Sequence, residues 1–166
     1  MRVIKNPADF PFGEIGQPSE ELGAPRHRKV AALHELWEAR RDGRVMPRKA
    51  DMRPSDMVKF LEHVYMVDIL DGAQDFRVRL FGTGVSSMLG GDYAGALLSE
   101  TPPELHWRGE VYWLAFQRRA PLFYLFELEP FGRPMVTTEN GLFPLANEQG
   151  EFAHLLCISV GLPTGL

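Results

Sequence analysis

The chain has 166 residues, a net charge of −4 and 45% hydrophobic residues, which suits one globular domain with a sizeable core. The acidic balance excludes a generally basic nucleic-acid-binding protein, and the single cysteine, Cys157, excludes an internal disulfide and fits a reducing compartment. The longest apolar run that could be helical, 111–116, is too short to span a membrane, and Asn6 and Pro7 interrupt any signal peptide. We expect a cytoplasmic protein that binds neither nucleic acid nor membrane.

The N-terminal part predicts an arm, a helix and a loop. Residues 1–25 are rich in proline and glycine and indicate an extended arm. A helix over 26–42 has one apolar stripe that must be buried, and a short helix is predicted at about 55–61. The acidic and basic residues interleaved here indicate a solvated, salt-bridged surface. We divide the chain into the arm, a helical segment 26–62 and a core domain 63–162.

The core domain begins with a predicted hairpin. Residues 64–70 and 76–81 are rich in β-branched and aromatic residues, and an Asp-Gly turn lies between them. Strict alternation in the second strand places Phe76, Val78 and Leu80 on one face.

Short helical turns, a longer helix and three strands follow the hairpin. Residues 85–101 contain helical turns separated by glycines, and a helix over 104–119 is apolar on nearly every side. The closing strands are predicted at 122–128, 135–145 and 152–160, the middle one broken near Asn140-Gly141. The predicted class is α+β: a five-stranded antiparallel sheet with helices inserted between strands two and three and an amphipathic N-terminal helix.

Local motifs make this order more specific. The first helix carries Trp37 and is followed by a proline–arginine–aspartate loop at Pro47–Asp51. Further matches are the strand and turn 76–84, with the glycine-rich run that follows it, and Phe143–Leu145. Over about residues 33–160 the chain resembles the PAS superfamily, and within it a bacterial single-domain subgroup with this helix and loop.

The resemblance implies a PAS fold and a stand-alone sensory or regulatory module rather than an enzyme. Arg53, Gly91 and Ala94 depart from the subgroup's pattern, which affects inherited ligand contacts and not the fold. No output domain fits in the remaining residues, so the signal would pass in trans to a partner protein. PAS domains commonly dimerise through an N-terminal helix and a sheet surface, so the resemblance also implies a homodimer.

An excess of aromatic and apolar side chains predicts a ligand pocket between the sheet and the inserted helices. A solid core with the same lining is the alternative, which the sequence leaves open. The candidate pocket residues are Val78, Leu80, Met88, Leu89, Trp113, Phe116, Tyr124 and Phe126.

The opposite face of the sheet is predicted to be covered, because alternation in strand 122–128 places apolar side chains there too. The amphipathic helix is the expected cover, contributed by the same chain or by a second subunit. The candidate residues for helix docking or dimerisation are Val30, Leu33, Leu36, Trp37, Phe123 and Leu125.

No cofactor or metal site is predicted. The five histidines show no metal-ligand spacing, and His154 and Cys157 point to opposite faces of one strand. We do not expect haem, for which His106 on the long helix is the candidate axial ligand, or a covalent flavin adduct, since the inserted helices lack a cysteine. An unidentified small ligand, apolar or mixed in character, remains the expectation.

Two other functions stay open. A small α+β enzyme, isomerase-like or thioesterase-like, could use the same apolar cavity, and a polar side chain of Asp68 or His154 projecting into a cavity would favour it. A scaffolding dimer without ligand is the third possibility.

Overall fold

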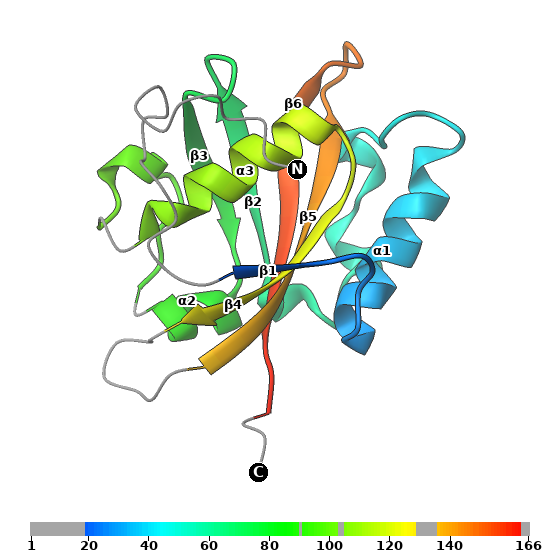
Figure 1. The fold of residues 1–166 in the computed structure, drawn as a ribbon. Coiled ribbons are helices and arrows are strands. Elements are labelled where there is room, and N and C mark those ends of the chain that lie inside the picture. Colours follow the sequence, from blue (N-terminus) through cyan, green and yellow to red (C-terminus); the bar gives the residue numbers. More distant parts are fainter. Residues whose placement is uncertain (1–18, 90, 103–104, 129–135, 164–166) are drawn as a thin grey trace.

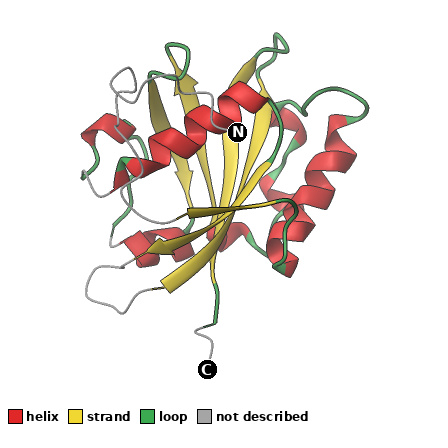
Figure 2. Cartoon of the chain, viewed as in Figure 1, coloured by secondary structure: helices red, strands yellow, loops and turns green. Residues whose placement is uncertain are grey.

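The computed structural model describes residues 19–89, 91–102, 105–128 and 136–163, which form one antiparallel sheet with helices on both faces (Figures 1 and 2). The predicted α+β class is confirmed, with six strands in the order β1-β4-β5-β6-β2-β3. The strands are β1 Ser19–Leu22, β2 Val64–Leu70, β3 Asp75–Phe81, β4 Leu122–Leu128, β5 Val136–Ala146 and β6 Phe152–Gly161. The helices are α1 Arg28–Arg41, α2 Thr83–Leu89 and α3 Trp107–Arg118.

The sixth strand corrects the prediction of five. Residues 19–22, which the sequence assigned to an extended arm, form β1 and pair with β4. Glu21 adds a two-pronged ion pair with Arg118 of α3, at 2.5 and 2.9 Å. Pairing with a sheet edge satisfies the backbone groups of a segment too short to fold alone. The rest of the arm, residues 1–18, lies outside the described residues.

Two further predictions of local structure are wrong. The short helix expected at 55–61 is replaced by single 3-10 turns at Pro54–Asp56 and Leu61–His63, and this bent path buries both Met57 and Phe60. Strand β5 runs unbroken through Gly141. The glycine serves close packing there, because a Cβ would lie 2.9 Å from the Phe143 ring and 3.2 Å from the Val30 side chain on α1.

A β-bulge changes the direction of one predicted core residue. The hairpin of β2 and β3 forms as predicted, but its register shifts so that Met66 pairs with Leu80 and Val67 with Val78. Arg79 is the extra residue between them. The bulge turns Leu80 to the opposite face from Val78, which corrects the strict alternation expected from the sequence.

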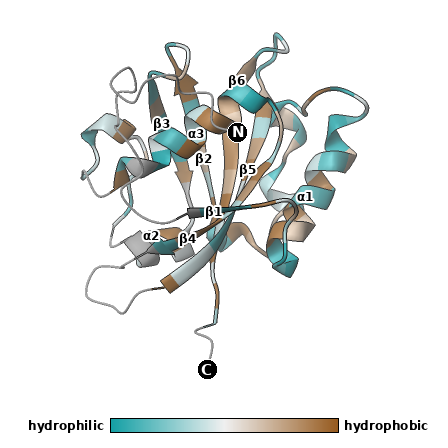
Figure 3. Cartoon of the chain, in the orientation of Figure 1, coloured by the Kyte–Doolittle hydropathy of each residue, from teal (hydrophilic) through white to brown (hydrophobic). Residues whose placement is uncertain are grey.

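The sheet has two apolar faces, each with its own core cluster. We call the face under α3 the α3 face and the face under α1 the α1 face; the two helices lie on opposite sides of the sheet (Figure 1). Hydrophobic colour runs along the central strands, whereas much of α1 is hydrophilic (Figure 3). The outer side of α1 is therefore solvated while its apolar stripe is buried.

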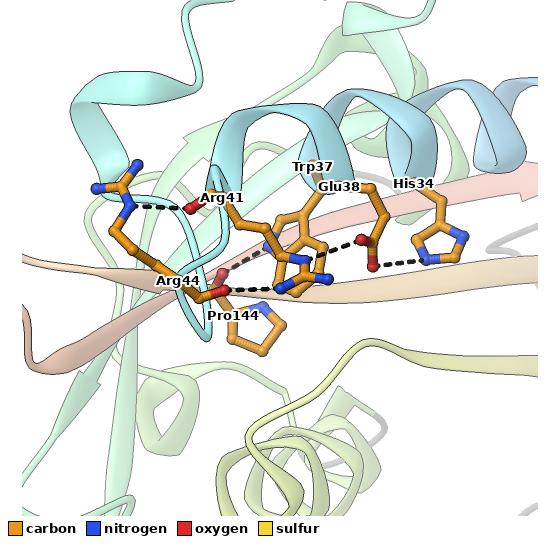
Figure 4. Close-up of polar contacts among 6 residues, drawn as sticks. All are labelled: His34, Trp37, Glu38, Arg41, Arg44 and Pro144. Carbon is orange, nitrogen blue, oxygen red and sulfur yellow. Dashed lines mark hydrogen bonds and ion pairs between the residues drawn. The ribbon is translucent and has the colours of Figure 1, made fainter.

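Helix α1 is anchored at both ends. The buried Glu139 of β5 accepts hydrogen bonds from the backbone N–H groups of Arg26 and His27, both at 2.8 Å, which places a carboxylate at the positive end of the helix. Towards the other end, the Trp37 indole donates to the carbonyl of Pro144 at 2.8 Å (Figure 4). These contacts explain why α1 docks in one register on β5.

Candidate ligand site

A cavity of about 820 Å³ opens on the α1 face. The segment 48–57, which follows α1, forms one wall, and strands β2, β3, β5 and β6 form the other. The apolar residues in its lining are Ala50, Met52, Pro54, Met57, Met66, Leu80, Leu145, Ala146 and Leu156. A volume of this size and a largely apolar lining are typical of small-molecule sites.

Positive charge lies at the exposed rim of the cavity. Arg48, Lys49 and Arg53 line it and are solvent-exposed, and none makes an ion pair within the described residues. Asp51 also lines it, but its carboxylate accepts from the backbone N–H of Arg48 and from Arg44, each at 2.9 Å. The Arg48 N–H and the Arg44 guanidinium together hold the pKa of Asp51 below its usual value.

One histidine is held in place beside the apolar floor. The Nδ1 of His154 lies 2.7 Å from a carboxylate oxygen of Asp68, and the other oxygen accepts from Arg79, the bulged residue of β3. Burial acts to raise the pKa of Asp68, but the hydrogen bonds from Arg79 and His154 outweigh it and lower that pKa. A carboxylate acceptor places the proton on Nδ1, which leaves Nε2 available on a ring that lines the cavity.

The pocket residues predicted on the α3 face are packed together where the structure describes them. Val78, Tyr124 and Phe126 are buried there with Trp113 and Phe116 packed against them. The space beside Val78 measures about 20 Å³, room for about one water molecule. Leu80 instead lines the large cavity on the α1 face, and the side chains of Met88 and Leu89 lie outside the described residues.

A buried polar cluster lies on the α3 face near the predicted pocket residues. The Arg108 guanidinium donates to the Tyr65 hydroxyl at 2.8 Å, and the Tyr112 hydroxyl donates to the same oxygen at 3.0 Å. Burial raises the pKa of Tyr112 to about 12 and also raises the pKa of Tyr65. The cluster fixes α3 against β2, so this face is organised by packing.

The structure places all six candidate docking residues in one cluster. Val30, Leu33 and Trp37 of α1 are buried with Phe123, and Leu36 and Leu125 pack against them. The Phe123 ring also meets His34 edge-on at 5.0 Å. In this structure the helix that covers the face belongs to the same chain.

Cys157 and His106, two further residues considered from the sequence, make contacts within the fold. Cys157 is buried, and burial raises the pKa of its thiol. The Nε2 of His106 lies 2.8 Å from the carbonyl of Thr101. Among the described residues, no three His, Cys, Asp or Glu side chains gather as a metal site would require. In the same part of the chain, no helix combines the length and the apolar character that a bilayer crossing demands.

Sequence reasoning missed the cavity residues of segment 48–57. The sequence predicts a salt-bridged surface that includes Arg48 and Lys49. Among the residues that the structure describes, Arg41 and Arg44 form such ion pairs and these two do not. The sequence feature that could have indicated this wall is the proline–arginine–aspartate loop, which is followed by the buried Met52 and Met57. Its role could not be assigned because two of the strands that complete the cavity, β5 and β6, are distant in sequence.

Comparison with known proteins gives one match. A model of the PAS domain family matches residues 25–159, most of the chain and all of β2 to β5. No curated protein matches, and no solved structure matches. The matched range includes the inserted helices and the loop that lines the cavity, and the chain belongs to the PAS domain family.

Proposed function

We propose that this PAS domain is a regulatory module that responds to a ligand in the cavity of the α1 face and signals in trans to a partner protein. The observation that carries the proposal is the position of the cavity wall, segment 48–57, directly after α1. Arg44 pairs with Asp51 at 2.9 Å, and Arg40 of α1 pairs with Asp56 at 3.2 Å. A ligand that moves the wall therefore acts on the C-terminal end of α1.

The strength of these links suits a switch. Both ion pairs are partly exposed, and each such pair contributes about 1 kcal/mol or less. Figure 4 shows Arg41 and Arg44 bonded to each other's backbone and Arg41 to Glu38, at the end of α1 away from its Glu139 anchor. A ligand needs only a modest difference in affinity to shift such a contact between two positions.

The test has two readouts on the full chain. Native mass spectrometry of protein purified from cells, followed by denaturation, should release a small molecule. Hydrogen exchange should then show different protection of the last turn of α1 in the loaded and emptied protein. A protein that carries no ligand, and whose α1 exchange is unchanged by any compound that binds the cavity, would contradict the proposal.

The homodimer stays a prediction. The apolar face expected to form it is covered by the chain's own α1, so a dimer would need another surface. Light scattering that shows a stable monomer at micromolar concentration would contradict it.

A second candidate function is an acid–base enzyme, favoured by the His154–Asp68 pair. Asp68 holds the ring at 2.7 Å, so Nε2 of His154 could exchange a proton with a substrate in the cavity. Incubating the protein with its released ligand separates the two functions. Unchanged ligand supports the regulatory module, whereas conversion that is lost in His154→Asn supports the enzyme.

A further inference from the structure

We infer that the ligand of the α1-face cavity is an amphipathic carboxylate, with its chain on the apolar floor and its carboxylate at the cationic rim. This inference rests on the proposed function, since it names the ligand class of the same cavity. It follows from three features of the lining: the floor, the rim and the histidine between them.

The floor suits an unbranched apolar chain. Three methionines, Met52, Met57 and Met66, come from both walls and lie among leucines such as Leu145 and Leu156. Methionine side chains are flexible and polarizable, so they adapt to a chain that lacks a fixed shape. Met52, Met57, Leu145 and Leu156 have only 0–6% of their surface exposed and lie beneath the floor. The partly exposed Met66 and Leu80 are the apolar side chains that a ligand chain could contact there.

The rim selects negative charge. Arg48, Lys49 and Arg53 stand here in a chain whose net charge is −4, so the positive rim does not follow from overall composition. Asp51 is paired with Arg44, which leaves Glu148 as the one lining carboxylate without an ion pair among the described residues. Arginine donates to a carboxylate through two parallel hydrogen bonds, a geometry that a neutral headgroup cannot match.

His154 adds a polar point next to the floor. Asp68 fixes the ring, and Arg79 fixes Asp68, so the imidazole is oriented before a ligand arrives. A few preorganised polar groups in an apolar lining set the orientation of a ligand.

Isothermal titration calorimetry on the full chain tests the class with three probes. We expect saturable binding of decanoate, binding of decanol weaker by about tenfold, and no heat from acetate, because both chain and charge are needed. Arg53→Gln should weaken decanoate binding by about tenfold and leave decanol unchanged. Lys59→Gln is the matched control, since Lys59 is an exposed cation outside the lining, and it should change neither.

The results that overturn the inference differ from those that overturn the proposed function. Decanol binding as tightly as decanoate, or Lys59→Gln weakening decanoate as much as Arg53→Gln, would remove the carboxylate assignment. A ligand of another class released in native mass spectrometry would do the same and leave the regulatory proposal intact. An empty protein with unchanged α1 exchange would end both.

Discussion

On the α3 face, one helix lies directly across the strands, and a tyrosine–arginine cluster is buried between that helix and the sheet. On the α1 face, α1 contacts β5 and β6. Segment 48–57, which contains short 3-10 turns, lies opposite β2 and β3 across the cavity. The space beside Val78 on the α3 face has a volume of about 20 Å³, and the cavity on the α1 face about 820 Å³. A helix packs a continuous row of side chains against a sheet. Short 3-10 turns cannot present such a row, so space remains between segment 48–57 and the strands.

The comparison assigns different roles to the two faces. On the α3 face, the buried Arg108 lies among tyrosine side chains. Loss of any hydrogen bond in this cluster would leave a buried polar group unpaired, so the cluster contributes to stability. The α1 face combines an anchored helix with a cavity and exposed ion pairs, the features on which the proposed response to a ligand rests. The predictions below test this division, beginning with the largest expected effect.

Trp37→Ala should remove the main anchor of α1. Trp37 is 2% exposed, packs on Phe143 and donates to the carbonyl of Pro144. We expect a loss of about 3–5 kcal/mol in the free energy of unfolding, measured by urea denaturation. Glu35→Ala, on the exposed side of the same helix, is the control; a loss for Trp37→Ala as small as the control's would show that α1 is not docked here.

High pH should destabilise the α3 face. Burial raises the pKa of Tyr112 from 10.0 to about 12, so in this window the unfolded chain binds fewer protons than the folded one. The stabilisation is complete below pH 10 and is lost as pH rises towards 12, by about 2–3 kcal/mol from this residue. Urea titrations across this range should show the fall, and it should be smaller in Tyr112→Phe. An equal fall in both proteins would place the effect elsewhere.

Gly141→Ala should show how closely α1 approaches the sheet. The new methyl group would meet Phe143 at 2.9 Å and Val30 at 3.2 Å, and such overpacking costs about 1–3 kcal/mol. Gly161→Ala is the matched control in the neighbouring strand, because its nearest contact is an ordinary 3.6 Å. Equal melting temperatures for the two variants would mean that the α1 face is looser than the structure shows.

Arg44→Gln should have the smallest effect on stability and a clear effect on response. Its ion pair with Asp51 is exposed, so the expected loss is about 0.2–1 kcal/mol. Ligand binding should still occur, but the change in α1 hydrogen exchange should shrink because one of the two links to the wall is gone. An undiminished change would show that the signal takes another route.

The local sequence determined much of this protein. Alternation and turn residues located β2, β3, β4 and β6, and the spacing of Val30, Leu33 and Trp37 located α1 and its buried side. These features depend on residues close together in one helix or strand. Backbone geometry sets the spacing at which their apolar side chains share a face. The PAS assignment followed because element order and motifs are both read along the chain.

Tertiary structure decided the rest. Pairing of β3 with β2 produced the bulge that turned Leu80 to the α1 face, and pairing with β4 made a strand of residues 19–22. Packing decided how the described parts of the two faces differ. Arg108 and three tyrosines are buried together on the α3 face, whereas segment 48–57 meets the nearby β2 and β3 and the distant β5 and β6 around the cavity. Residue types alone predicted an apolar lining on both faces, but only the positions of neighbouring elements decide whether side chains fill the space.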